Sequence, residues 1–338
     1  MMISVRKLAF LFFLVILSCN SPSKNNIDNI VSISGKTMGT TYTIKFLPKS
    51  DSPKEIEENY LQIEAILKDI NRQMSTYIAD SEISTFNSSE KTGWFKISKD
   101  FETVIRKSFQ YHQLSNGLYD ITIMPLVNLW GFGPAIFDSK PSEAEIDSVM
   151  AFIGQNLIEI DELKIRKKDP RVQIDLSSIA KGFAVDKLFN SLKHYDELFI
   201  EIGGEIRTKS INKDWKIGIN TPAINNINND IELIISLNNL SIATSGNYRN
   251  YYFDKDNFFH HEINPNTGYP VLSNIGSVSV ISNESCMDAD ALSTMLYVMD
   301  SRLINDIIDN INQAESLVIK VFEDGTFKKE FSQNFPLN

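Results

Sequence analysis

Hydrophobic residues recur along the chain with two different periods, which predict a mixture of helices and strands. The apolar positions Ile56, Ile63, Leu67 and Ile70 are separated by three, four or seven residues, as on one face of an amphipathic helix. The same spacing of apolar positions predicts helices over residues 53–74, 100–114, 142–153, 178–195, 288–299 and 303–311.

Shorter apolar runs, several of which alternate with polar residues, predict strands. Residues 30–46 alternate around a turn at Gly39, and residues 317–322 and 327–331 form a predicted hairpin across Asp324-Gly325. The other predicted strands cover residues 172–176, 197–202, 215–219, 231–237, 240–244 and 276–282.

The order of these elements favours an α+β fold, with mixed sheets and packed helices. Strands and helices alternate without the steady strand–helix–strand rhythm of a doubly wound sheet. The apolar stretch 119–135 is too broken by proline and glycine for one helix, so we expect a strand or turn that leads into an ordered loop. Because no repeat or clear linker interrupts residues 31–335, they are predicted to form a single large unit.

Composition excludes several classes of protein. Hydrophobic residues make up 42% and charged residues 22% of the 338 residues, as in folded globular proteins. The chain has 33 Lys+Arg against 43 Asp+Glu, a net charge of −10, which argues against a nucleic-acid partner. The two cysteines are too few for a disulfide framework or a cysteine-rich zinc site.

The first residues predict export and lipid attachment. A basic pair, Arg6-Lys7, precedes an apolar run from Leu8 to Leu17, which is typical of a signal peptide and too short to span a bilayer. The tetrad ILSC ending at Cys19 resembles a bacterial lipobox, so residues 1–18 are the predicted lipoprotein signal peptide and Cys19 the lipidated residue. Residues 19–30 are the predicted flexible tether, and a buried N-terminal helix is the alternative. Cys286 is expected to be a buried, inert thiol.

One predicted helix places oxygen atoms on a single face. Asp290, Ser293 and Thr294 have the spacing i, i+3, i+4, so a carboxylate and two hydroxyls can point to one place. Oxygen ligands of this kind suit Mg²⁺, which also binds substrate phosphates. The alternative is an ordinary polar helix start with Asp288 as its N-cap.

Three other residues could take part in chemistry, and two of them have a structural alternative. Asp175 lies between a predicted strand and a predicted helix, where a carboxylate either caps the helix or faces a site. Lys181 could supply charge to a pyrophosphate. His261 is one of four histidines, and a lone histidine is more often structural than catalytic.

The motifs together resemble those of one family. Walker A, zinc-spaced His/Cys, G-x-S-x-G and Rossmann G-x-G-x-x-G motifs are absent from the sequence. Eight blocks instead occur in a fixed order: TMGT (37–40), STYIADSEISTFN (75–87), GLYDITIMPLVNLWGFGP (117–134), DLSSIAKG (175–182), IGG (202–204), TSGNYRNYY (244–252), HEINPNTG (261–268) and DADALST (288–294). In this order they resemble the bacterial FAD:protein FMN transferases, the ApbE-type flavin transferases, and imply the T-fold-related architecture of that family.

The resemblance implies an enzyme that cleaves FAD with Mg²⁺, attaches FMN to a threonine of a partner flavoprotein and releases AMP. The implied acceptors are flavoproteins of membrane redox complexes, namely sodium-pumping NADH:quinone reductases or RNF-type complexes. The positions that correspond to FAD contacts in the family are Met38, Tyr77, Leu118, Tyr119, Asp120, Asp175, Lys181 and Ile263. The implied metal positions are Ser178, Asp290, Ser293 and Thr294, with Ser178 contributing a backbone carbonyl, and His261 falls next to the reacting phosphate.

Two positions depart from the family, which often has Asp where this chain has Ser293 and Asn264. Ser293 lowers the negative charge of the implied metal site, and Asn264 is expected to form the turn before Pro265.

His261 is the best candidate base for the acceptor threonine, with Asp290 as the second catalytic residue. The alternative functions are an Mg²⁺-dependent FAD pyrophosphatase and a non-catalytic flavin-binding lipoprotein. The expected location is the periplasmic side of a bacterial membrane.

Overall fold

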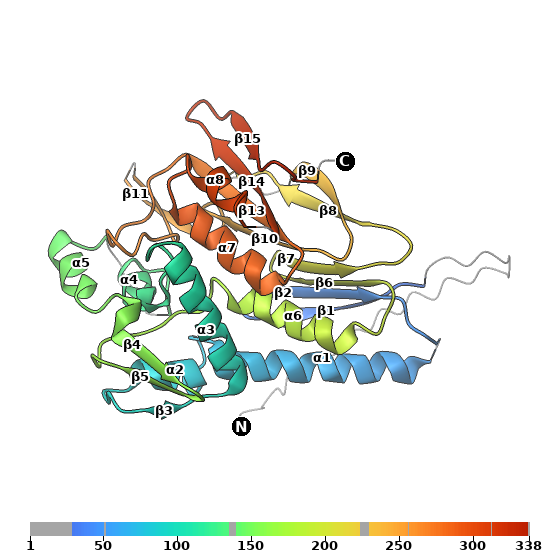
Figure 1. The fold of residues 1–338 in the computed structure, drawn as a ribbon, viewed down its shortest axis with the longest axis horizontal. Coiled ribbons are helices and arrows are strands. Elements are labelled where there is room, and N and C mark those ends of the chain that lie inside the picture. Colours follow the sequence, from blue (N-terminus) through green and yellow to red (C-terminus); the bar gives the residue numbers. More distant parts are fainter. Residues whose placement is uncertain are drawn as a thin grey trace, which may run out of the picture.

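An eight-stranded antiparallel sheet organises the chain (Figure 1). The computed structural model describes residues 29–336, except for 51, 135–139, 224–229, 256 and 312. The strand order is β1-β2-β6-β7-β10-β13-β14-β15. These strands are β1 (Val31–Thr37), β2 (Thr40–Phe46), β6 (Leu198–Ile202), β7 (Glu205–Lys209), β10 (Ser241–Gly246), β13 (Ile275–Ser282), β14 (Ala314–Val321) and β15 (Phe327–Phe331). The signal peptide, Cys19 and most of the predicted tether lie outside the described residues.

Helices cover one face of the sheet and a hairpin covers the other. The helices α1 (Pro53–Met74), α6 (Ala180–Leu192) and α7 (Cys286–Val298) pack on the first face, with α3 (Lys99–Leu114) against α7 (Figure 1). On the second face, β8 (Trp215–Asn220) and β9 (Ile231–Leu237) close a smaller core with Ile206, Ile281 and Leu317. Because both faces are covered, every residue of β13 is buried.

The remaining elements lie beside this layered core. They are α2 (Glu82–Ser88), β3 (Phe95–Lys96), a 3₁₀ turn (Ile121–Ile123), α4 (Met124–Leu129), α5 (Glu143–Met150), a second 3₁₀ turn (Gln155–Leu157), β4 (Ile158–Asp161), β5 (Lys164–Lys167), β11 (Tyr251–Asp254), β12 (Asn257–His260) and α8 (Ile304–Ile308). β3, β5 and β4 form a small sheet, and β11 and β12 form a two-stranded sheet. Among the described ranges, no helix combines the length and apolar character needed to cross a membrane.

The α+β prediction is confirmed, as are most of the predicted helices and the hairpin at the end of the chain. The predicted strand 172–176 is wrong, because Asn87 binds both backbone groups of Ile174, at 2.8 Å each, in place of a neighbouring strand. Within the stretch 119–135, residues 121–129 form a 3₁₀ turn and the short helix α4 where we expected a strand or turn. The N-cap of α7 is Ser285 and Asp288 lies three residues later, so the alternative placing Asp288 at the cap is also wrong.

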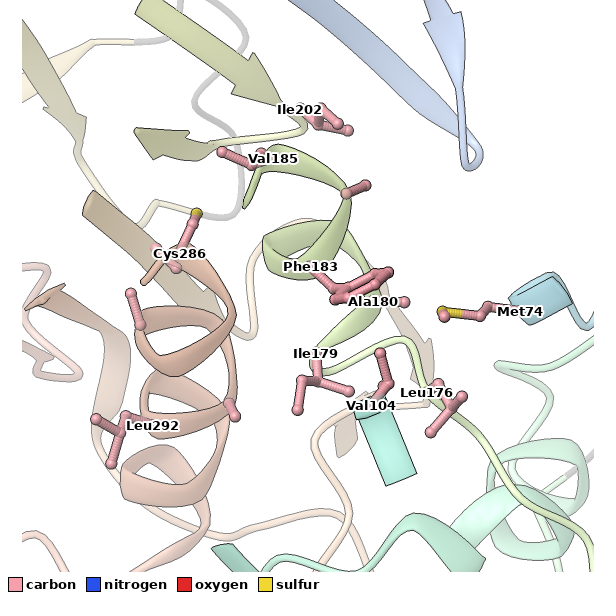
Figure 2. Close-up of a cluster of buried hydrophobic side chains, with 14 of the residues drawn as sticks. Met74, Val104, Leu176, Ile179, Ala180, Phe183, Val185, Ile202, Cys286 and Leu292 are labelled. Carbon is pink, nitrogen blue, oxygen red and sulfur yellow. The ribbon is translucent and has the colours of Figure 1, made fainter. Parts of the chain in front are cut away.

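The contact between α6 and α7 lies at the centre of the core. Figure 2 shows α6, with Phe183, between α7 and Met74 at the end of α1. Cys286 at the start of α7 is fully buried, as expected. Gly182 makes the close approach possible, because a Cβ atom there would lie 2.4 Å from the carbonyl oxygen of Cys286. The two helices therefore meet at backbone distance.

We expect Gly182→Ala to lower the free energy of unfolding by about 1–3 kcal/mol, the usual cost of overpacking a core. Helix propensity alone would raise the free energy of unfolding, because alanine stabilises a helix by up to about 1 kcal/mol relative to glycine. Gly93→Ala is the matched control, since Gly93 is exposed and a Cβ atom there meets nothing within 4 Å. Denaturant unfolding of both variants measures the difference, and equal midpoints would contradict the backbone contact.

Candidate functional site

A cavity of about 330 Å³ opens where α6 begins and β10 ends, with α7 along one wall. Segments far apart in the sequence meet there, including the β6–β7 turn and the residues on either side of the β11–β12 hairpin. The predicted site residues that line the cavity are Tyr77, Leu118, Tyr119, Asp120, Asp175, Ser178, Lys181, His261, Ile263, Asp290 and Thr294. The fold thus gathers nearly the whole predicted set around one space.

Two predicted site residues do not line this cavity. Met38 lies in the turn between β1 and β2 and lines a second pocket beside α1. Ser293 is fully buried in α7, where its hydroxyl donates to the carbonyl oxygen of Asp290 at 2.9 Å. Neither side chain is therefore among those that face the cavity.

Asp290 and Lys181 form a buried charge cluster with Glu205, which follows the β6–β7 turn. The Lys181 ammonium lies 3.3 Å from Glu205 Oε1 and 3.7 Å from Asp290 Oδ1. The other oxygen of Asp290 accepts the backbone N–H of Gly182 at 2.9 Å. Burial alone lowers the pKa of Lys181, but the two carboxylates outweigh burial and raise it. Lys181 therefore remains a cation at neutral pH.

Three buried carboxyl groups line the same cavity as this lysine. Glu262 also lines the cavity and is buried, like Glu205 and Asp290. Burial raises the pKa of all three carboxyl groups, because it disfavours their charged forms. Glu205 Oε2 is also buried without a hydrogen-bond partner among the described residues. A bound cation would lower the electrostatic cost of holding these groups together.

A chain of hydroxyls on α7 and β10 leaves oxygen lone pairs for such a cation. The hydroxyl of Ser293 donates to a carbonyl, so the contact of 2.9 Å between Ser245 Oγ and Ser293 Oγ uses the proton of Ser245. The contact of 2.9 Å between Ser245 Oγ and Thr294 Oγ1 then uses the proton of Thr294. Thr294 Oγ1 therefore keeps a lone pair with which it can coordinate a metal ion. Its oxygen lies on the same helix as the Asp290 carboxylate, and the donor set fits Mg²⁺.

No three His, Cys, Asp or Glu side chains of the described chain are arranged as a ready-made metal site. The hard oxygen donors that line the cavity near Asp290 include the hydroxyls of Thr294 and Ser178. Ser178 Oγ shares a hydrogen bond of 2.8 Å with the hydroxyl of the buried Tyr119. These oxygen donors are of the kind that Mg²⁺ binds together with water and phosphate.

His261 has one ring nitrogen oriented by the backbone. Its Nδ1 lies 3.2 Å from the carbonyl oxygen of Asn250, which can only accept, so Nδ1 carries the proton. Nε2 then bears the lone pair in the neutral ring and lies 3.5 Å from Glu262 Oε1. The ring lines the cavity and is about one-third exposed, so Nε2 can take a proton from a bound group.

Other predicted residues shape the cavity or its entrance. Tyr77 is 73% exposed and has a free aromatic face, whereas Tyr119 is buried in the wall. Asp175 accepts from the backbone N–H and the hydroxyl of Ser177, so it shapes the turn before α6 as well as lining the cavity. Asp120 is bound by Thr122 and by the backbone N–H of Gln155, which holds two turns together.

Several lining residues were not predicted as site residues. Glu205 and Glu262 directly follow Gly204 and His261, and Ser245 lies within the block 244–252. Their positions inside or directly after a quoted motif were the available signal, but only the fold shows that they face one cavity. Asn264 has the expected turn role, since its Oδ1 accepts the backbone N–H of Asn266 at 2.8 Å.

Comparison with known proteins gives consistent results. A sequence model of the ApbE family matches residues 38–318. The chain belongs to the ApbE family. The chain is 39% identical over 302 residues to an FAD:protein FMN transferase of Haemophilus influenzae, covering 86% of this chain and 87% of the relative. The identity to an FAD:protein FMN transferase of Vibrio cholerae is 37% over 330 residues, or 95% of each chain.

Solved structures of ApbE proteins share the fold. The flavin transferase ApbE of Vibrio cholerae matches with a TM-score of 0.81 and 36% identity, over 91% of this chain and 98% of that one. The ApbE protein of Thermotoga maritima matches with a TM-score of 0.78 and 26% identity, over 91% and 98% of the two chains. The predicted family, its fold and the transferase class are thereby confirmed.

The histidine next to His261 predicts a pH dependence of stability. His260 is buried, its Nε2 donates to the carbonyl oxygen of Val271 at 2.9 Å, and its Nδ1 accepts the N–H of Glu262 at 3.3 Å. Both contacts suit the neutral ring, and burial lowers the pKa of His260 to about 4. The unfolded chain takes up this proton near pH 6.5. Stability is therefore lost as the pH falls from about 6.5 to about 4, by about 3 kcal/mol.

Urea unfolding at a series of pH values measures this loss. We expect His260→Gln to be less stable at pH 7 and to show a flatter decline between pH 6.5 and 4. His194→Gln is the control, because His194 is exposed, and its decline should match that of the original protein. Parallel curves for all three proteins would contradict this role of His260.

Proposed function

We propose that this ApbE-family protein is an Mg²⁺-dependent FAD:protein FMN transferase that attaches FMN through a phosphoester bond to a threonine of a partner flavoprotein and releases AMP. The observation that carries the proposal is the meeting of Asp290, Lys181 and His261 at one cavity. Relatives named FAD:protein FMN transferase, 37% and 39% identical over most of their length, support it.

The reaction exchanges one phosphorus–oxygen bond for another. The threonine oxygen attacks the phosphorus on the FMN side of the pyrophosphate, the bridging bond breaks, and AMP leaves with the bridging oxygen. The threonine proton goes to Nε2 of His261, which is available because Nδ1 already donates to Asn250. Glu262 Oε1, 3.5 Å from Nε2, would stabilise the imidazolium that forms.

The cavity also provides positive charge and hard oxygen ligands. Lys181 is held as a cation and lines the space, so it can attract the pyrophosphate. Asp290 and Thr294 would hold Mg²⁺ with Ser178, and Ser293 would support the site from behind. When bound, Mg²⁺ supplies charge that stabilises the leaving phosphate. Tyr77 and Tyr119 would pack against the ring systems of FAD, and Leu118 and Ile263 would add apolar contacts.

We extend the proposal to where the enzyme works. Residues 31–335 form the catalytic unit, and lipidated Cys19 holds it on the periplasmic side of a membrane, as the signal peptide and lipobox of the sequence support. A tether at the membrane would place the enzyme near flavoproteins of sodium-pumping NADH:quinone reductases or RNF-type complexes. Mass spectrometry of a co-expressed acceptor subunit tests the function, and we expect FMN on a threonine.

A competing function uses water in place of threonine. An Mg²⁺-dependent FAD pyrophosphatase would release FMN and AMP rapidly from FAD without an acceptor, and a flavin-binding lipoprotein would bind FAD without turnover. We expect slow FAD cleavage alone and fast transfer when the acceptor subunit is added. Rapid acceptor-independent cleavage, with no FMN on the acceptor, would contradict the transferase proposal.

Asp290→Asn tests the proposed metal ligand. The amide oxygen of the variant can still accept the N–H of Gly182, so the fold should survive while the ligand charge is lost. We expect at least a hundredfold loss of transfer, together with weaker Mg²⁺ binding measured by calorimetry in the presence of FAD. Asp300→Asn, an exposed carboxylate paired with Arg302, is the control and should keep full activity. Undiminished transfer by Asp290→Asn, or in excess EDTA, would contradict the metal role.

His261→Ala tests the proposed base. We expect transfer to fall by about 10²–10⁴-fold at saturating acceptor, because the variant lacks the Nε2 atom that is proposed to take the threonine proton. Binding of FAD, followed by the quenching of its fluorescence, should change little. His194→Ala serves as the control, since His194 is exposed and does not line the cavity. An unchanged rate at saturating acceptor would show that His261 is not the base.

A further inference from the structure

Arg249 is a cation at the cavity that the proposed reaction does not use. It lies between β10 and β11, its side chain is exposed, and among the described residues that line the cavity it is the only arginine and Lys181 the only lysine. Lys181 is held between two carboxylates, those of Glu205 and Asp290. Arg249, by contrast, forms no ion pair with a carboxylate of the described chain; its hydrogen bond goes to a backbone carbonyl. Its charge therefore remains available to a ligand.

A backbone turn and an aromatic ring hold the guanidinium group of Arg249 in place. Nη1 donates to the carbonyl oxygen of Gly203 at 3.1 Å, and the central carbon lies 5.7 Å from the centre of the Tyr248 ring. A Cβ atom at Gly204 would lie 3.6 Å from Nη1, so glycine at this position keeps a side chain away from the guanidinium. The contact with Gly203 uses one of five N–H donors, and the others can bind oxygen atoms of a ligand.

The β6–β7 turn brings Arg249 close to Lys181. The ammonium of Lys181 lies 3.3 Å from Glu205 Oε1, and Glu205 is two residues after Gly203, the residue that binds Arg249. Two residues span at most about 7 Å of chain. The two cations therefore contact opposite ends of one short turn at the edge of the cavity, so a ligand with two negative groups can contact both.

The charge of a pyrophosphate favours a second cation at this place. The cavity around Lys181 contains the buried carboxyl groups of Glu205, Glu262 and Asp290, so this group by itself offers little positive potential to a dianion. Arginine keeps its charge at all physiological pH values. Its planar guanidinium also matches a phosphate with two parallel N–H···O bonds, which the ammonium of a lysine cannot form.

We propose that Arg249 is a second pyrophosphate-binding residue, whose guanidinium binds oxygen atoms of one phosphate of FAD. The inference rests on the proposed FMN transfer, because it assumes that FAD occupies this cavity. Lys181 and the proposed Mg²⁺ would bind the pyrophosphate from the side of α6 and α7, and Arg249 from the side of the β6–β7 turn. Arg249 would thereby contribute to the affinity of the enzyme for FAD.

Arg249→Gln tests this contact with FAD as the probe, in buffer with Mg²⁺ and without acceptor. We expect the Kd for FAD, followed by the quenching of flavin fluorescence, to rise about ten- to hundredfold, as for the loss of a hydrogen bond to a charged group. Arg249→Lys should recover only part of the affinity, because it keeps the charge and loses the paired donors. The matched control is Arg302→Gln, an exposed arginine that does not line the cavity, and its Kd should be unchanged.

Two further measurements separate a phosphate contact from a structural role. Salt screens the attraction between a guanidinium and a phosphate, so the Kd for FAD should depend less on the sodium chloride concentration in Arg249→Gln than in the unaltered protein. Competition by AMP and by FMN identifies the phosphate. Weaker competition by AMP assigns the contact to the adenylate side of FAD, and weaker competition by FMN assigns it to the flavin side.

Three results would overturn the proposal. An unchanged Kd for FAD in Arg249→Gln would exclude the contact, and a raised Kd with the original salt dependence would show that Arg249 only supports the turn at Gly203. A raised KM for the acceptor with an unchanged Kd for FAD would assign Arg249 to acceptor binding. Failure of the proposed function is distinguishable, because the unaltered protein would then bind no FAD, or bind it and transfer no FMN to the acceptor.

Discussion

The hydrogen bond between the Gly182 N–H and the Asp290 carboxylate is the contact on which the site depends. It requires α6 and α7 to meet at backbone distance, and the absence of a side chain at Gly182 permits this. Lys181, the preceding residue, then lies next to the same carboxylate. The packing of two core helices thus positions the candidate metal ligand and the candidate pyrophosphate-binding cation together.

Charge balance explains how an acidic protein can bind an anionic nucleotide. Around Lys181 the cavity holds the buried carboxyl groups of Glu205, Glu262 and Asp290. Burial raises the pKa values of these carboxyl groups, because a low-polarity environment disfavours their charged forms. A divalent cation with a pyrophosphate would complete this arrangement, whereas a purely basic pocket would not need the metal.

Rigid support surrounds the proposed base as well. Trp130 and Phe132 pack against the β11–β12 hairpin. The carbonyl oxygen of Asn250, directly before β11, accepts from Nδ1 of His261 and so fixes the tautomer of that ring. His260 points the other way and is bound to Val271, so adjacent histidines have opposite roles. One is buried and structural, and the other lines the cavity. The alternation of side chains along an extended chain accounts for this division.

The sequence by itself determined the helical and strand periodicity, the α+β class and, through the ordered motifs, the family and many of the residues that line the candidate cavity. The sequence pattern was sufficient to predict an element that depends only on its own spacing of apolar residues, as for α1. It was insufficient at residues 172–176, where the side chain of the distant Asn87 takes the place of a neighbouring strand. Only the tertiary structure decided that Glu205 and Glu262 share the cavity, that Ser293 is buried behind its lining and that Met38 lies elsewhere. The physical reason is that side-chain orientation and burial arise from contacts between segments far apart in the chain, which periodicity does not record.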